Sequence, residues 1–203
     1  MLGGKLMTFF SMTLSLFLIM NSVGHITAYL DLVESLNRRK RRLIIIREMF
    51  LALLIMVIFN YVGGLLLSAL EVDTQTILLS GGLILFLIAI RMIFPNKKES
   101  TEVVKEKEEP FIFPIATPMI AGPSCLTTIM LYSHQSSRST VILAILIAWA
   151  FSVTILLLAQ RIKDLVGKRA LFAVERLMGL VLTMMAMEML VKGLKSIALN
   201  GIK

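Results

Sequence analysis

The stretch TVILAILIAWAFSVTILLLA, residues 140–159, contains twenty consecutive residues without a charged side chain. A helix needs about twenty apolar residues to cross the hydrocarbon core of a bilayer, so this stretch predicts a transmembrane helix. The rest of the chain agrees, because 57% of its 203 residues are hydrophobic, 17% are charged, and the mean hydropathy is +0.86. Soluble globular domains have far less apolar compositions. The composition therefore predicts an all-α integral membrane protein.

Five more apolar runs appear when the chain is followed outward from this stretch. We expect six transmembrane helices, at Leu6–Leu36, Leu43–Leu70, Thr76–Phe94, Phe111–Tyr132, Thr140–Ala159 and Val174–Ala198. The first run continues past Met20 without a small-residue cleavage site, which indicates a retained span and not a removed signal peptide. Residues 96–110 contain KKES and KEKEE and are predicted to be a polar linker. The linker separates a three-helix half, 1–95, from a second half, 111–203.

Lysine and arginine residues gather at alternate connections between the predicted spans. Of the 21 basic residues, 15 lie in or beside the connections after spans one, three and five, and 5 lie on the other side. The remaining one, Arg91, lies inside span three. The positive-inside rule then predicts that both termini face away from the cytoplasm and that the linker faces it. Topology and contact with anionic lipid explain the net charge of +8, so we expect no nucleic-acid partner.

Several kinds of chemistry are not expected from this sequence. The single cysteine, Cys125, cannot form an intrachain disulfide, a CxxC redox pair or a thiolate metal cage. The predicted spans contain no nucleophile, metal-ligand cluster or carboxylate pair at a convincing spacing. We therefore expect no metal site, no cofactor and no enzymatic activity.

The two halves of the chain resemble each other in sequence. GGLILFLIAIRMIF, which starts at Gly81, aligns with MGLVLTMMAMEMLV, which starts at Met178, at an offset of 97 residues. The polar breaks NSVGHIT, residues 21–27, and ATPMIAGPS, residues 116–124, align at an offset of 96 when Ser22 is laid on Pro118. Three spans per half would place the halves in opposite orientations. These matches predict two inverted three-helix repeats in which the first and fourth helices are broken.

The two breaks are the strongest functional signal in the sequence. Pro118 and Pro123 lack the amide proton of a helix interior, and Gly24 and Gly122 loosen the backbone. Unwound backbone at membrane depth is tolerated only where protein or a water-filled cavity satisfies it, so paired breaks point to a transporter binding site. The alternative is an ordinary proline kink, which needs no ligand. The matching positions of the two breaks favour the binding site.

A small-molecule site needs a few convergent polar groups, and both breaks supply them. The half-helix beyond each break would also present free amides to an anionic group, such as an amino-acid carboxylate. The candidate substrate-binding residues are Asn21, Ser22, Gly24, His25, Thr27, Thr117, Pro118, Ala121, Gly122, Pro123, Ser124, Thr127 and Thr128.

Three residues are candidates for coupling transport to H+ or Na+. His25 could relay protons, because the unperturbed pKa of histidine is about 6.5, or it could be a packed structural residue. Arg91 and Glu188 occupy matching positions in AIRM and AMEM. They could pair inside the membrane, or each could extend separately to its own membrane surface.

GGLILFLIAIRMIFP, ATPMIAGPSCLTT and ERLMGLVL resemble signature segments of the MarC family of bacterial inner-membrane proteins, which includes transporters of small neutral amino acids. The resemblance implies six spans and a location in the inner membrane. Two features depart from the family pattern. Ser22 and Thr27 stand where the first broken helix usually has prolines, and Glu188 stands where the last span usually has an amide.

The leading hypothesis is a secondary transporter that moves a small solute, such as a neutral amino acid, by rocking of the two repeats. The alternative is a membrane scaffold without transport activity, or a subunit of a larger complex. The expected partners are a small-molecule substrate and the lipid bilayer. The protein could also form a homo-oligomer.

Overall fold

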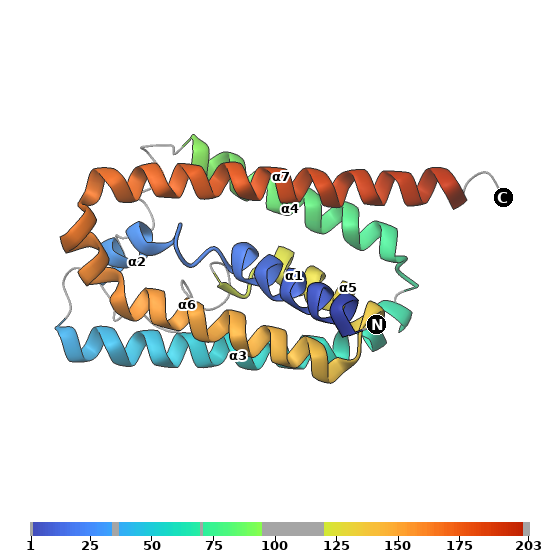
Figure 1. Cartoon of the computed structure of the whole chain (residues 1–203), viewed down its shortest axis with the longest axis horizontal. Coiled ribbons are helices and arrows are strands. Elements are labelled where there is room, and N and C mark those ends of the chain that lie inside the picture. Colours follow the sequence, from blue (N-terminus) through green and yellow to red (C-terminus); the bar gives the residue numbers. More distant parts are fainter. Residues whose placement is uncertain (1, 34–36, 70, 95–119, 201–203) are drawn as a thin grey trace.

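The computed structural model of the protein describes residues 2–33, 37–69, 71–94 and 120–200, and the regular structure in these ranges is entirely α-helical (Figure 1). The helices are α1 (Leu2–Met20), α2 (Ile26–Leu32), α3 (Arg38–Ala69), α4 (Thr74–Ile93), α5 (Pro123–Gln135), α6 (Arg138–Val166) and α7 (Lys168–Asn200). The predicted linker, 96–110, lies outside the described residues.

Four of these helices are long and apolar enough to cross a membrane. These stretches are Arg39–Ala69, Thr74–Ile93, Arg138–Val166 and Lys168–Ala198, and they correspond to the second, third, fifth and sixth predicted spans. Helix α7 has 33 residues, which at 1.5 Å per residue gives about 50 Å and exceeds the roughly 30 Å hydrocarbon core. Both ends of α7 therefore extend beyond the predicted span Val174–Ala198. The chain is a multi-pass membrane protein.

The first predicted span is broken, as expected. Helix α1 ends at Met20 and the short helix α2 begins at Ile26, so residues 21–25 form a turn inside the span. The fourth predicted span starts at Phe111, and its residues 111–119 lie outside the described ranges. Its described part consists of non-helical Ala121 and Gly122 followed by α5. Six complete spans are therefore not seen in the described residues.

The helices are arranged as two outer pairs with the broken segments between them (Figure 1). Helices α4 and α7 lie side by side along most of their length, and α3 packs against α6. Helix α1 packs mainly on α6, and α5 packs on α3 and α4. The indole Nε1 of Trp149 in α6 donates to the carbonyl oxygen of Met49 in α3 at 2.7 Å, which fixes that pair.

Two glycines set the close approach of α4 and α7. A Cβ added at Gly82 would lie 3.1 Å from the carbonyl oxygen of Ala186, and one at Gly179 would lie 3.1 Å from that of Ala89. Both contacts are tighter than ordinary van der Waals distances. The two glycines are separated by 97 positions, and so are the two alanines. The helices are therefore antiparallel, and small residues let their backbones come together.

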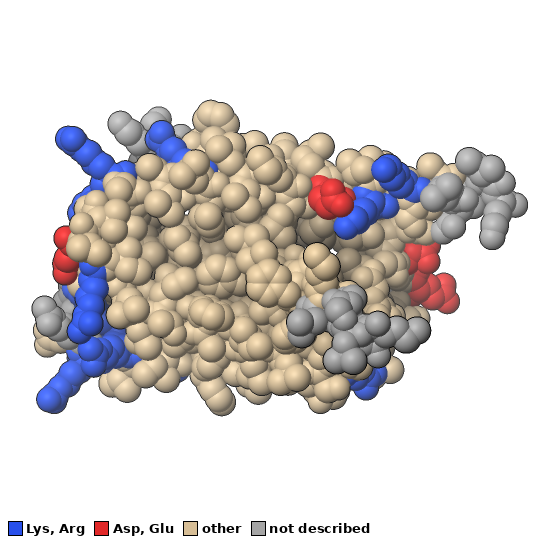
Figure 2. All heavy atoms as spheres, in the orientation of Figure 1, with Lys and Arg blue, Asp and Glu red and all other residues tan. Residues whose placement is uncertain are grey.

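The surface of the bundle is apolar around its middle and basic at one end. Figure 2 shows an uncharged belt, with Lys and Arg side chains gathered at the end where α3 begins and α6 ends. Helix α1 begins and α7 ends toward the opposite end (Figure 1). Large exposed side chains cover the belt, among them Phe10, Leu54, Leu87, Phe151 and Met184. This distribution matches a helical bundle whose sides face lipid.

Candidate functional site

The first break begins at Asn21, which has a left-handed backbone conformation. Asn21 has a φ of 49°, in the left-handed region that asparagine tolerates better than most residues. Its own amide still bonds to the carbonyls of Phe17 and Leu18, and the amide of His25 bonds to the Asn21 carbonyl at 3.1 Å. The amides of residues 22–24 donate no hydrogen bond to any acceptor in the described part of the chain. The turn therefore leaves three consecutive amide donors without an acceptor among the described residues.

The side chains of Asn21 and Ser22 are buried and only partly satisfied. Asn21 Nδ2 donates to the sulfur of Met92 in α4 at 2.9 Å. Asn21 Oδ1 and Ser22 Oγ are buried, and neither has a hydrogen-bond partner within the described residues. An unsatisfied buried polar atom costs about 1–3 kcal/mol, and native proteins contain few of them. Two such atoms on consecutive residues indicate a place where a ligand can supply the missing hydrogen-bond partners.

Gly24 is required by the space around the turn. A Cβ at this position would lie 2.6 Å from both Asn21 Oδ1 and the Cε methyl of Met92. Any other residue would push these groups apart. The glycine therefore keeps Met92 and the Asn21 side chain packed against the break.

His25 and Thr27 continue the first break into α2. His25 is half-buried at the start of α2, and its carbonyl accepts from the amide of Tyr29 at 2.9 Å. The hydroxyl of Thr27 donates to Glu175 Oε2 in α7 at 2.6 Å. This bond ties the short helix α2 to α7. Thr27 therefore anchors the break, and its hydrogen atom is not available to a ligand in this conformation.

The second break is only partly described. Thr117 and Pro118 lie outside the described residues. Ala121 and Gly122 are buried and non-helical, and the exposed Pro123 occupies the first turn of α5, where its missing amide proton has no helical partner to lose.

The hydroxyls that follow the second break bond to their own helix. Thr127 Oγ1 and Thr128 Oγ1 both donate to the carbonyl oxygen of the buried Ser124, at 3.0 Å and 2.8 Å. Each threonine oxygen can still accept a hydrogen bond. In the described part of the second break, these two hydroxyls therefore offer acceptors rather than free donors.

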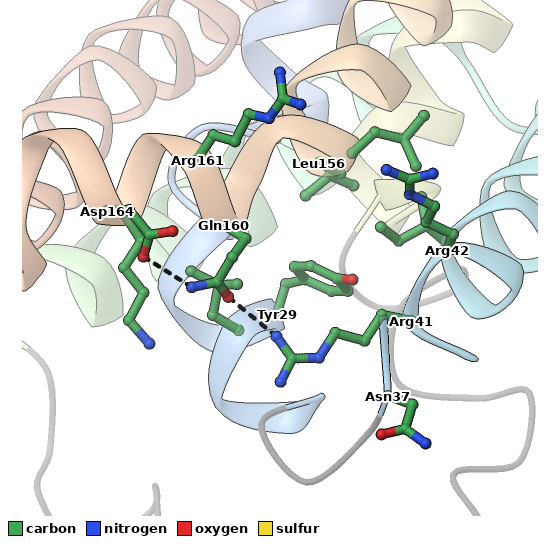
Figure 3. Close-up of a pocket in the computed structure, with 12 residues that line it drawn as sticks. Tyr29, Asn37, Arg41, Arg42, Leu156, Gln160, Arg161 and Asp164 are labelled. Atoms are coloured by element: carbon green, nitrogen blue, oxygen red, sulfur yellow. Dashed lines mark hydrogen bonds between the residues drawn. The ribbon is translucent and has the colours of Figure 1, made fainter. Parts of the chain in front are cut away.

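Two cavities reach toward the first break from opposite ends of the bundle. The α7 cavity, about 460 Å³, lies among α1, α4, α5 and α7, and its mostly apolar lining includes Ile19, Met185 and Met189 together with Ser15, Thr128, Glu188 and Lys192. The basic cavity, about 540 Å³, lies among α2, α3 and α6, and its lining includes Tyr29, Arg41, Arg42, Gln160, Arg161 and Lys163 (Figure 3).

The first break lies between these two cavities along the chain. Ile19 lines the α7 cavity two residues before Asn21, and Tyr29 lines the basic cavity four residues after His25. Between them, the side chains of Met20, Ser22 and Ile26 are at most 1% exposed. The cavities are therefore separated by a closed layer of side chains that contains the unpartnered hydroxyl of Ser22.

Comparison with known proteins identifies the family. The family model described as MarC family integral membrane protein matches residues 6–198. The chain belongs to the MarC family. No solved structure matches it.

Relatives of this MarC-family chain cover nearly its whole length. A UPF0056 membrane protein of Buchnera aphidicola subsp. Schizaphis graminum is 44% identical over 188 residues, which are 92% of this chain and 95% of the relative. The UPF0056 inner membrane protein YhgN of Escherichia coli K12 is 40% identical over 182 residues, with 89% and 92% covered. A UPF0056 membrane protein of Chlamydia pneumoniae is 32% identical, with 94% and 95% covered.

In this MarC-family protein, Arg91 and Glu188 do not pair. Glu188 Oε1 lies 3.1 Å from Lys192 Nζ on the same helix, and both side chains are largely exposed. The antiparallel packing of α4 and α7 brings Met92 and Ile93, which follow Arg91, against Gly179, nine residues from Glu188, which is about 14 Å along the helix. Arg91 and Glu188 therefore lie far apart along this pair of helices. The ion-pair hypothesis is wrong for this conformation.

Two buried polar side chains were missed in the sequence analysis of this MarC-family chain. Glu48 in α3 is 2% exposed, and its Oε1 lies 3.2 Å from Arg47 Nη2 while its Oε2 has no partner in the described residues. Asn60, also in α3, donates to the carbonyl of Arg138 at 3.4 Å and leaves its Oδ1 unpartnered. The available signal was their position inside an apolar run, since polar residues within spans are often functional.

Proposed function

We propose that this protein is a secondary transporter that moves a small solute of the neutral amino acid class across the bacterial inner membrane by alternating access. The observation that carries the proposal is the pair of buried, unpartnered oxygens on Asn21 and Ser22. They lie at a helix break between two cavities, one toward each end of the bundle. A solute bound there would have to pass from one cavity to the other.

The chemistry of the first break suits a zwitterion. The oxygens Asn21 Oδ1 and Ser22 Oγ can accept hydrogen bonds from an ammonium group. The three consecutive amides of residues 22–24 can donate to a carboxylate. A neutral amino acid carries both groups on one carbon atom. Binding it would satisfy, at a single turn, donors and acceptors that the protein otherwise leaves unpaired.

An inverted repeat would supply the motion. Helix α5, which follows the second break, packs on α3 and α4, and α2, which follows the first break, packs on α6 and α7, so equivalent helices have equivalent neighbours. The contacts of Gly82 and Gly179 are also equivalent at a constant offset of 97 residues. These features support two repeats related by an axis in the membrane plane. Rocking of one repeat against the other would open each cavity in turn while the site stays in place.

Charge supports an orientation for the transporter. The basic end of the bundle faces the cytoplasm under the positive-inside rule, which places both termini on the opposite side (Figure 2). The E. coli relative is named an inner membrane protein, which supports the same location for this chain. The basic cavity would then open to the cytoplasm and the α7 cavity to the outside. His25, Glu188 or Arg91 would couple transport to H+ or Na+.

The test is counterflow in proteoliposomes that contain the purified full chain and are preloaded with one neutral amino acid at a time. We expect labelled amino acid to accumulate with the wild-type protein, and Gly24→Val to abolish this because its side chain would displace Asn21 and Met92. Gly64→Val is the matched control, since a Cβ there has only an ordinary contact, at 3.5 Å, with His134.

The same vesicles distinguish the alternatives. Repeating the assay with a pH gradient and with a sodium gradient identifies the coupling ion. A wild-type protein that exchanges no solute in any vesicle would contradict the proposal and favour the scaffold hypothesis. Equal transport by Gly24→Val and wild type would show that the substrate does not use the first break.

A further inference from the structure

The basic cavity has features of its own that do not depend on transport. It lies at the end of the bundle where Lys and Arg gather, between the short helix α2, the first turns of α3 and the last turns of α6 (Figure 3). Its volume of about 540 Å³ falls within the range of small-ligand sites. The charges of this cavity, the hydroxyl of Tyr29 and the apolar part of its wall together indicate which class of ligand it binds.

The charge of the cavity is strongly positive. Among described residues, four basic side chains and one carboxylate, Asp164, line it. Arg42, Arg161 and Lys163 form no ion pair within the described part of the chain. Basic side chains crowded together repel one another, and each is stabilised by an anion nearby. The cavity therefore favours a ligand with at least one negative charge.

One arginine of the cavity is held in place by a short chain of hydrogen bonds. Arg41 Nη1 donates to Gln160 Oε1 at 3.0 Å, and Gln160 Nε2 donates to Asp164 Oδ1 at 3.0 Å (Figure 3). This chain joins α3 to α6 across the cavity. A guanidinium has five N–H donors in a fixed plane, so fixing its direction prepares it to meet a tetrahedral or planar oxyanion.

Tyr29 adds a hydroxyl that has no partner. Its side chain is 3% exposed, it lines the cavity, and its phenol oxygen makes no hydrogen bond with any described residue. Figure 3 shows the hydroxyl directed into the open space on the side of Arg42. The hydroxyl opens into the cavity, so it can donate a hydrogen bond to an acceptor there. Arg41 and Arg42 line the same cavity.

The remaining wall is apolar. Leu30, Ile45, Leu156 and Leu157 line the cavity next to the charged groups. We propose that the basic cavity binds a phosphate group, with its oxygens received by the arginines and the Tyr29 hydroxyl. The source is either the phosphodiester of an anionic lipid, whose glycerol and acyl carbons would cover the apolar wall, or a free phosphate. Basic pockets between membrane helices commonly hold such headgroups.

The experiment measures binding to the full chain purified in detergent. Three probes are titrated while the thermal unfolding midpoint is recorded: dihexanoyl phosphatidylglycerol, inorganic phosphate and dihexanoyl phosphatidylcholine. We expect phosphatidylglycerol to bind and raise the midpoint, phosphatidylcholine to have little effect, and the affinity to fall as salt rises. Binding of inorganic phosphate as well would assign the site to phosphate in general, and its failure to bind would assign the site to the lipid.

The variants locate the binding. Arg42→Gln together with Arg161→Gln should weaken phosphatidylglycerol binding by about twentyfold, because each lost charge accounts for about fivefold. The matched control is Arg138→Gln together with Lys195→Gln, which removes two charges from the other end of the bundle. Tyr29→Phe keeps every charge and should weaken binding about tenfold through its lost hydroxyl.

Two results would overturn the proposal. The first is equal affinity for phosphatidylglycerol in the wild type and in the Arg42 and Arg161 double variant. The second is equal binding of phosphatidylcholine and phosphatidylglycerol, since phosphatidylcholine offers the same phosphodiester without net negative charge. The proposal does not rest on transport, so failure of the counterflow assay would leave it standing.

Discussion

A Ser22→Ala substitution removes a hydroxyl that is fully buried and has no hydrogen-bond partner in the described part of the chain. The folded protein pays the cost of taking that hydroxyl out of polar surroundings, and such a cost is about 1–3 kcal/mol. Alanine keeps the Cβ and loses only one oxygen, so the cavity that it creates is small. We therefore expect Ser22→Ala to raise the stability of the unliganded protein by about 1–3 kcal/mol.

The matched control is Ser152→Ala. Ser152 in α6 is also 0% exposed, but its Oγ lies 3.6 Å from the sulfur of Met20, to which it donates. Removing this hydroxyl breaks a hydrogen bond and releases no unsatisfied group. We expect Ser152→Ala to be neutral or to lower stability by up to about 1 kcal/mol. The two serines differ in their partners and not in their burial.

The assay is thermal unfolding of the purified protein in detergent, followed by counterflow in proteoliposomes. For a chain of this size 1 kcal/mol corresponds to roughly 2–4 °C, so Ser22→Ala should raise the midpoint by roughly 2–12 °C. The same variant should transport more slowly, because it has lost an acceptor of the proposed site. A lower midpoint, equal to that of Ser152→Ala, would refute the reasoning and show that the Ser22 hydroxyl is satisfied.

Two other predictions concern the architecture. A reporter fused after Lys203 should be active outside the cytoplasm and one inserted near Glu102 should be active inside it; cytoplasmic activity at Lys203 would contradict the inverted arrangement. Gly82→Ala and Gly179→Ala should each lower the unfolding midpoint relative to Gly64→Ala, by an amount equivalent to about 1–3 kcal/mol of overpacking, because only their Cβ atoms would meet the facing helix backbone. Equal midpoints for all three would show that α4 and α7 separate easily.

Much of the helical framework could be predicted from the sequence. Apolar runs of about twenty residues can only be long helices in a bilayer, so the four spanning helices follow from hydropathy. The break at residues 21–25 follows from a polar turn that contains Gly24 inside such a run. The correspondence of Gly82 and Gly179 was visible as an offset of 97 residues. These features depend on local composition and on spacing along the chain.

The partners of the site residues could not be predicted. The bond from Thr27 to Glu175 joins residues 148 positions apart, and no local pattern specifies it. Glu48 follows Arg47 near the start of an apolar run, where a solvated interfacial position is the ordinary expectation; its burial depends on how α3 packs. Both facts depend on tertiary packing.

The two breaks differ in their chemistry. When Ser22 is aligned with Pro118, at an offset of 96 residues, Gly24 corresponds to Ile120 and Thr27 to Pro123. Within the described residues, the first break leaves an amide oxygen, a hydroxyl and three amides without partners, whereas the threonine hydroxyls after the second break are bonded to their own helix. An amino acid has no two-fold symmetry, and a site with equal halves could not distinguish its ammonium from its carboxylate. Under the proposed transport function, an inverted repeat would supply the motion, and specific contacts concentrated in one repeat would recognise the substrate.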